Sequence, residues 1–169
     1  VINTTHEAVS VWVENRKESI SQISQDPQLI DLVEKHLPVP HKKEAILKSE
    51  TLKSLRDYFN TKRDRYGDIG FFIIAPDNVN VASMRSNNIG IENLIAKQRP
   101  RLLQRAFFGE TVFVPPVHSD VTIKTDSRSS GQNGTSLFFA SPIKDRLGLV
   151  IAVLTLRFDP GQDFSRLTK

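Results

Sequence analysis

Residues 67–86, GDIGFFIIAPDNVNVASMRS, contain two strands and the turn between them, and the fold prediction depends on this stretch. The FFIIA segment is apolar on both faces, as in a central strand that is covered on both sides. PDN is typical of a turn, and an alternating segment follows it. The two-residue period places four residues of this second strand on one face: Val79, Val81, Ser83 and Arg85. The stretch therefore predicts an antiparallel hairpin whose second strand ends in polar residues.

Three helices are expected before the hairpin. Residues 4–24 carry apolar side chains at steps of three and four, which predicts a long helix. An Asp-Pro pair at 26–27 suits the cap and first turn of a second, short helix. A third helix is expected from about 43 or 49 to 63, with Leu52, Leu55 and Phe59 as its apolar stripe.

One helix and further strands are expected after the hairpin. The helix runs from about 91 to 108, and Pro100 should kink it or split it in two. TVFVPPV predicts a short strand ended by prolines, and VTIKTD is compatible with another strand. After a polar loop at 127–135, SLFFASPI and LVIAVLTLRF predict a closing hairpin. The order of elements predicts an α+β fold with an antiparallel sheet.

Length and composition limit the class of protein. The chain has 169 residues, which is enough for one domain with a core, and a net charge of +4. Its basic residues form no dense stripe with aromatic residues, so no nucleic-acid partner is expected. The absence of cysteine excludes disulfides, thiolate metal sites and cysteine nucleophiles. No stretch approaches the roughly 20 apolar residues of a membrane span.

The sequence contains no pattern typical of catalysis or metal binding. It has no G-x-S-x-G, Walker or G-x-G-x-x-G motif, and its four histidines lack the spacing of a helical zinc site. We therefore expect no catalytic residue, no metal and no cofactor.

Polar residues at positions expected to be buried form the candidate binding site. They are Arg63, Tyr66, Ser83, Arg85, Thr111 and Ser141. Arginines together with a tyrosine and hydroxyls suit a small anionic ligand, because a guanidinium binds a carboxylate through two hydrogen bonds. Taken singly, each residue is better explained as an ordinary sheet-edge or helix-end residue. Only their gathering around one sheet favours a site.

The order of these elements resembles the Cache (PAS-like, also called PDC) sensor domains of bacterial and archaeal membrane receptors. The resemblance covers nearly the whole chain and rests on VSVWVENRKESISQIS, DPQLIDLV, LRDYFNTKRDRYGDIGFFIIAPDNVNVASM, RAFFGETVFVPPV and SLFFASPIKDRLGLVIAVLTLRFD. It departs from the family at the hairpin turn, where members often have an Asp-x-x-Gly turn and PDNVN has no glycine. The tryptophan of the family's amino-acid-binding pattern is also missing, so amino-acid specificity is not carried over.

The resemblance implies a PAS-like antiparallel sheet of about five strands with helical cover and a long N-terminal helix. It divides the chain into an N-terminal helical region (1–62), a Cache lobe (63–159) and the start of a linker or second lobe (160–169). The chain would then be the distal lobe of a double-Cache receptor. A single-Cache protein remains an alternative.

As a Cache domain, the chain would be periplasmic or extracellular and anchored by a membrane helix preceding its first helix. It would bind a small ligand, and a second copy would pack along the first helix through Val9, Val13 and Ile20. The signal would be a movement of that helix, and a kinase, cyclase or chemotaxis module elsewhere would supply any catalysis. The main alternative is a structural or partner-binding lobe without a ligand. A hydrolase is disfavoured by the lack of a nucleophile motif.

Overall fold

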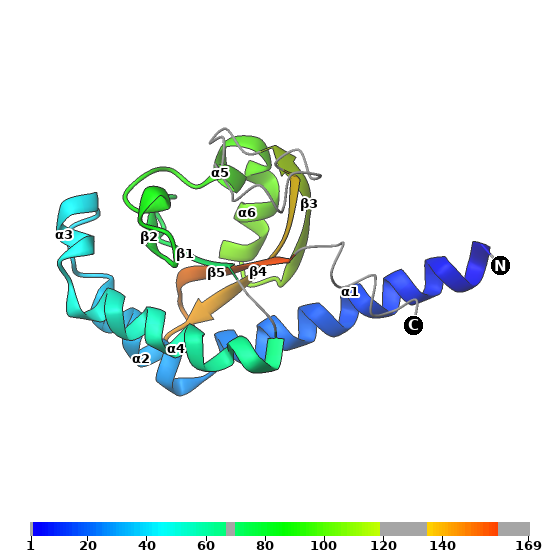
Figure 1. The fold of residues 1–169 in the computed structure, drawn as a ribbon, viewed down its shortest axis with the longest axis horizontal. Helices are drawn as coiled ribbons and strands as arrows, with labels where there is room; N and C mark the ends of the chain where they lie inside the picture. Colours follow the sequence, from blue (N-terminus) through cyan, green and yellow to red (C-terminus); the bar gives the residue numbers. More distant parts are fainter. Residues whose placement is uncertain (1, 67–69, 119–134, 159–169) are drawn as a thin grey trace.

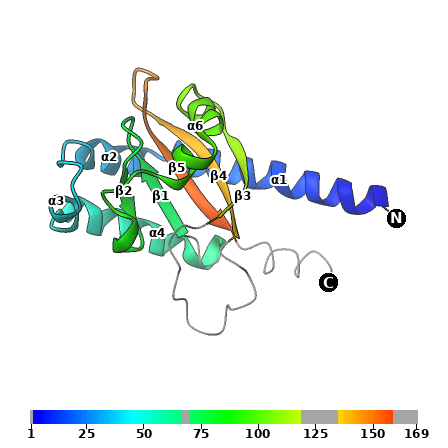
Figure 2. The ribbon, with the colours of Figure 1, turned by 90° about the horizontal axis from the view of Figure 1, so that it is seen from above.

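The computed structural model describes residues 2–66, 70–118 and 135–158. Its sheet has five antiparallel strands in the order β2-β1-β5-β4-β3 (Figure 2). The strands are β1 (Gly70–Ile74), β2 (Asn80–Ser83), β3 (Val112–His118), β4 (Thr135–Lys144) and β5 (Val150–Phe158). The predicted α+β, PAS-like architecture is confirmed.

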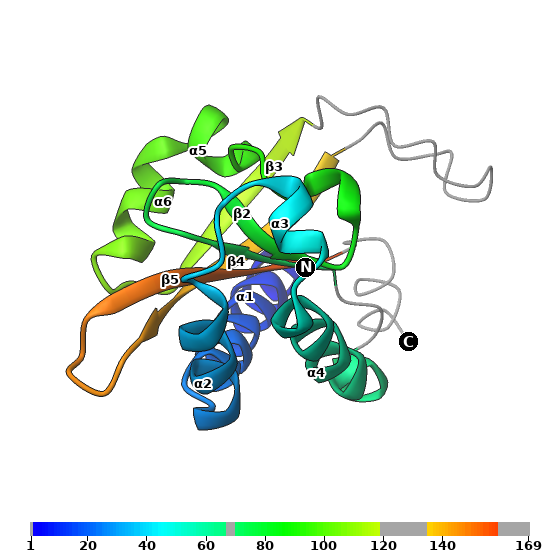
Figure 3. The same cartoon turned by 90° about the vertical axis from the view of Figure 1, so that its left-hand side faces the viewer.

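Helices cover both faces of the sheet (Figure 3). One face carries α1 (Ile2–Ser24), α2 (Pro27–His36) and α4 (Glu50–Tyr66). The other face carries α5 (Leu94–Gln98) and α6 (Pro100–Phe107). The short α3 (Lys43–Leu47) and the 3-10 helix η1 (Ser86–Asn88) lie at the β2 end. We call these two sheet faces the α1 face and the α6 face.

The long N-terminal helix is confirmed. Helix α1 runs beneath the sheet, and its N-terminal part extends beyond the sheet (Figure 1). Trp12, Ile20 and Ile23 are buried, and the Arg16 guanidinium lies 5.1 Å from the centre of the Phe158 ring. Ile20 is 0% exposed, because it packs into this chain's own core. The predicted contribution of Ile20 to a contact with a second copy is therefore wrong.

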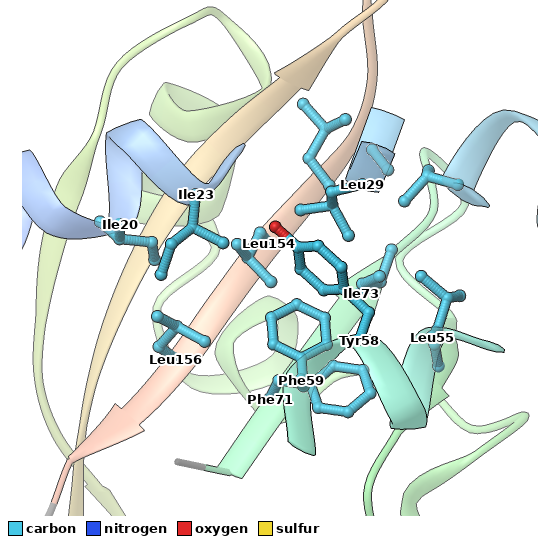
Figure 4. Close-up of a cluster of buried hydrophobic side chains, with 14 of the residues drawn as sticks. Ile20, Ile23, Leu29, Leu55, Tyr58, Phe59, Phe71, Ile73, Leu154 and Leu156 are labelled. Atoms are coloured by element: carbon cyan, nitrogen blue, oxygen red, sulfur yellow. The ribbon is translucent and has the colours of Figure 1, made fainter. Parts of the chain in front are cut away.

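The larger core lies on the α1 face. Figure 4 shows side chains of α1, α2 and α4 meeting those of β1 and β5. The rings of Phe59 and Phe71 stack with centroids 4.0 Å apart, and Ile73 and Leu154 lie beside them in the same cluster. Burying each such side chain contributes roughly 1.5–3 kcal/mol. A second cluster, which includes Ile74, Val114 and Val153, packs under α5 and α6.

Several predicted boundaries need correction. The third helix, α4, begins next to the later of its two expected starts, ends three residues beyond residue 63, and is preceded by the separate short helix α3. Pro100 divides the next helix into α5 and α6, which is one of the two expected outcomes. Strand β3 continues through Pro115 and Pro116 instead of ending there, with a register shift between Val114 and Val117. An edge strand tolerates proline because one side of its backbone has no ladder to complete. The VTIKTD segment, the tail after Phe158 and nearly all of the 127–135 loop lie outside the described residues.

The β1–β2 hairpin is confirmed, but its face assignment is partly wrong. Ser83 lies opposite Phe72 and Ala82 opposite Ile73, and the register shifts between Ile73 and Ile74. Because of this bulge, Val81 and Ala82 both join the core on the α1 face. Val81 and Ser83 therefore do not share a face.

Candidate functional site

The six predicted site residues occupy three places in the fold. Arg63 and Tyr66 belong to the last turn of α4, and their side chains lie outside the described part of the chain. Ser83 ends β2, and Arg85 follows it at the start of η1. The third place holds the remaining pair, Thr111 and Ser141.

Ser83 is buried at the end of β2, and Arg85 is exposed. Ser83 faces α6, because its cross-strand partner Phe72 packs against the cluster under that helix. The Arg85 amide donates a 3.3 Å hydrogen bond to Ser83 Oγ. Arg56 of α4 donates from Nε to the Ser83 carbonyl, at 2.9 Å, and from Nη2 to Ser86 Oγ, at 3.2 Å. Arg56 was not singled out from the sequence, although it lies next to Leu55 of the buried stripe.

Two buried amides continue this polar region toward α5. Asn93 Nδ2 donates to Asn80 Oδ1 at 2.7 Å, and Asn93 Oδ1 accepts from the Ile95 amide at 2.8 Å. The second bond caps α5 at its N-terminus. The end of β2 is thereby tied to α4 on one side, through Arg56, and its beginning is tied to α5 on the other.

Thr111 and Ser141 meet on the α1 face. Their hydroxyl oxygens are 2.9 Å apart, and Ser141 Oγ is 3.0 Å from Ser24 Oγ of α1. Ser24 and Ser141 are each 1% exposed. The sequence reading missed Ser24, although it lies four residues after Ile20 and next to Ile23 on the buried stripe. These hydroxyls line a cavity of about 460 Å³ between the end of α1, the start of β3 and the β4–β5 hairpin.

The structure does not bring all six residues together. Ser141 lies opposite Leu154, which belongs to the core on the α1 face, whereas Ser83 lies on the α6 face. Thr111 and Ser141 therefore cannot contact the same small ligand as Ser83. The described candidate residues form two separate polar regions, one on each face of the sheet.

A buried histidine links the helices of the α1 face to β2. The His36 ring donates from Nε2 to the Val81 carbonyl at 2.5 Å, and Nδ1 lies 2.6 Å from Thr51 Oγ1. Since a carbonyl only accepts, the neutral ring carries its proton on Nε2, and Nδ1 accepts from Thr51. Burial lowers the pKa of His36 from its ordinary value of 6.5, the bond to Val81 opposes this shift, and nearby His41 adds to it. His36 therefore acts as a neutral structural link.

Comparison with solved structures identifies the fold. The Vibrio cholerae histidine kinase DctB sensor domain matches 94% of this chain with a TM-score of 0.63 and 15% identity. The E. coli DcuS sensor domain matches 92% of this chain with a TM-score of 0.60 and 11% identity. This chain spans 53% of the DctB domain and 94% of the DcuS domain. No family model and no curated protein matches the sequence. The chain has the PAS-like fold of these Cache (PDC) sensor domains.

Within the described residues, no helix is both long and apolar enough to span a bilayer.

Proposed function

We propose that this chain is the extracytoplasmic sensory domain of a membrane receptor of the histidine kinase, cyclase or chemoreceptor type. It binds a small ligand and passes the signal through α1. The observation that carries this proposal is the arrangement of α1, which packs along the sheet with Trp12, Ile20 and Ile23 and extends beyond it (Figure 1). A displacement of the sheet would therefore also displace this helix. The solved domains with the same fold are described as sensor domains, which supports the same role here.

The ligand site proposed for this function lies at the edge of the sheet where β2 ends. Ser83 and exposed Arg85 are its described members, and Arg63 and Tyr66 at the end of α4 are proposed as further contacts. Guanidinium groups favour an anionic ligand such as a carboxylate. The hydrogen bonds from Arg56 to Ser83 and Ser86 hold this region against α4. Ligand binding at Ser83 would thereby reach α4 and the helices of the α1 face.

Signalling requires only that the ligand bind two states of the domain with different affinity. The protein would lie outside the cytoplasm, anchored through α1, and it would work as a homodimer along that helix. Val11, which is 58% exposed, is an apolar residue of α1 that a second copy could cover. Any catalytic output would reside in another domain.

The alternative is a lobe that binds no ligand and positions another domain. One observation favours it: the Ser83 hydroxyl and carbonyl already have partners within the chain, Arg85 and Arg56. Ligand screening distinguishes the two functions.

A thermal-shift screen against amino acids, dicarboxylates, short fatty acids, sugars, polyamines and purines tests the proposal. A ligand present at 100 times its dissociation constant should stabilise the domain by about 2.7 kcal/mol. Arg85→Ala should abolish the shift, whereas Arg101→Ala, at an exposed position of α6, is the matched control. A shift that survives Arg85→Ala would contradict this site but keep the sensory role. No shift with any compound of the panel would favour the structural lobe.

A further inference from the structure

The cavity on the α1 face differs in position and chemistry from the site proposed for sensing. Its volume, about 460 Å³, is within the range of small-molecule sites. Ser24, Thr111, Ser141, Lys144 and Asp145 are among the residues that line it. Ser141 faces α1, on the opposite side of the sheet from Ser83. A molecule in this cavity would touch the C-terminal end of the long helix directly.

The hydroxyl groups of the cavity form a series of hydrogen bonds. Each hydroxyl has a single proton, and this identifies the donor of every bond in the series. Ser24 donates its only hydroxyl proton to the Ser21 carbonyl, at 2.9 Å, because a carbonyl can only accept. In its 3.0 Å contact with Ser141, Ser24 Oγ must therefore be the acceptor. Ser141 has then used its proton, so Thr111 must donate in the 2.9 Å contact between them. The series of donors therefore runs from Thr111 to Ser141, from Ser141 to Ser24, and from Ser24 to the Ser21 carbonyl.

Thr111 Oγ1, the end of this series of hydrogen bonds at the cavity, is a hydrogen-bond acceptor. The Thr111 proton is committed to Ser141, so its oxygen has only lone pairs to offer, and Thr111 is half-buried where it lines the cavity. A molecule that donates an N–H or O–H matches this position, whereas a group that can only accept does not. This preference for a donor follows from the hydrogen bond of Ser24 to the Ser21 carbonyl, which fixes the donors of the other two bonds, and not from Thr111 alone.

Two further features make this part of the cavity favourable for positive charge. The cavity includes Ser21 and Ser24, in the last turn of α1, where the helix dipole is negative. Asp145 also lines it and is held in place, since its Oδ1 accepts from the Leu147 amide at 2.9 Å and from the Leu149 amide at 3.0 Å. The opposing charge is Lys144, an exposed residue whose amine lies beside Gly109, 3.8 Å from where a Cβ would be. Its long stem lets the amine move into solvent.

We infer that this cavity is a second binding site, which takes the primary ammonium group of a small polar molecule. The ammonium donates to Thr111 Oγ1 and is balanced by the Asp145 carboxylate, while Lys144 limits the affinity for cations. The inference does not depend on the sensory role or on a ligand at Ser83. It adds a place where a small molecule would act on the α1–sheet contact.

Three matched probes test this inference: ethanolammonium chloride, ethylene glycol and sodium glycolate, each titrated into ¹⁵N-labelled protein at constant ionic strength. Ethanolammonium should cause saturable changes at the backbone amides of Gly109, Thr111 and Ser141. Ethylene glycol should bind more weakly and glycolate should not bind there. Removing a carboxylate charge beside a bound ammonium weakens binding by roughly 10-fold or more, so Asp145→Asn should raise the ethanolammonium dissociation constant by about that factor.

Matched variants separate recognition from folding. Asp145→Asn retains an Oδ1 acceptor for the hairpin amides, and Asp31→Asn removes an exposed carboxylate of α2 as its control. Thr111→Val should abolish binding, and Thr111→Ser should retain it. Lys144→Met should tighten binding, in contrast to Lys53→Met on the exposed side of α4.

Three results would overturn the inference. The first is an equal effect of Asp145→Asn and Asp31→Asn in variants with dispersed, native-like spectra. The second is glycolate binding at these amides as tightly as ethanolammonium. The third is the absence of saturable changes there with all of the probes. Changes confined to the amides of Ser83 and Arg85 would locate ethanolammonium at the sensing site, and would count against the second site while supporting the first.

Discussion

Arg56 is the residue that fixes the polar end of β2, and it was absent from the sequence prediction. Sequence periodicity identified Leu52, Leu55 and Phe59 as the buried stripe of α4, and all three are buried. It could not indicate that the guanidinium of Arg56 would reach across to Ser83 and Ser86, because these partners lie 27 and 30 residues away in the chain. The pairing depends on how α4 lies against the sheet.

Replacing Arg56 should therefore destabilise the fold. Arg56→Met removes both hydrogen bonds and leaves the Ser83 carbonyl without this donor, which should cost about 1–3 kcal/mol. Arg56→Lys should recover only part of the loss, since an ammonium lacks the two-pronged geometry of a guanidinium. Urea unfolding midpoints measure the effect. If Arg56→Met is no more destabilising than Lys53→Met, at a nearby exposed position, the link contributes nothing.

His36 should make the stability depend on pH. Burial lowers its pKa, so the unfolded chain binds a proton more readily than the folded one near neutral pH. The contribution of neutral His36 is fully present above about pH 6.5 and is lost progressively as the pH falls toward the lower folded-state pKa. Urea unfolding at pH 7.5 and below 6.5 should therefore show a fall in stability that His36→Gln reduces. The exposed His6→Gln is the matched control. An unchanged pH dependence in His36→Gln would contradict this role.

At the scale of elements, sequence patterns predicted α1, α2, β1, β4 and β5 well because each carries a local signal. Asp26 caps α2 with a 3.1 Å bond from the Gln28 amide, as the Asp-Pro pair indicated. The hairpin turn forms without a glycine, and Asn78 within it adopts φ 69°. Asparagine tolerates this left-handed conformation better than most residues. The departure from the family pattern therefore leaves the turn intact.

The bulge in the β1–β2 ladder was beyond local patterns. A two-residue period assumes an unbroken register, and one extra residue reverses the faces that follow it. This is why Val81 was assigned to the face of Ser83 but packs with Ala82. The same limit applies to the candidate site, since the sequence places Ser83 and Ser141 in strands but does not indicate the face that each side chain occupies.

The attachment of α1 to the sheet can be tested at one position. Ile20 is fully buried, so Ile20→Ala should cost about 2–5 kcal/mol through lost burial and the cavity that it leaves. Gln22→Ala, at an exposed position of the same helix, should change stability by no more than about 0.5 kcal/mol. The two variants should differ clearly in urea midpoint at a similar unfolding slope. Equal effects would mean that α1 is not held to the sheet through this residue.

At the scale of the whole molecule, the fold class follows from the order of elements, whereas the arrangement of the site does not. Helices before the hairpin and strands after it predict a sheet with helical cover, and the structure has that architecture. Which helices share a face is set by long-range packing, with α1, α2 and α4 on one side and α5 and α6 on the other (Figure 3). The cavity beside Ser24 and Ser141 arises only from that packing, because the two serines are 117 residues apart.

The layered arrangement predicts where the molecule is most stable. Strand β5 is paired on both sides, by β1 and β4, and Ala152, Val153, Leu154, Thr155 and Leu156 are all buried. Exposing its amides requires separating two ladders and opening both cores, so their hydrogen exchange should follow global unfolding. Strands β2 and β3 lie at the two edges of the sheet and should open at lower free energy.

Hydrogen-exchange mass spectrometry of the folded domain should therefore show the slowest exchange in β5, with β2 and β3 faster. Low urea should accelerate exchange in β5 most steeply, because global opening exposes the most surface. If the amides of β2 and β3 exchange as slowly as those of β5, the sheet opens only as a unit. In that case there is no local opening at β2 through which a ligand at Ser83 could shift the domain.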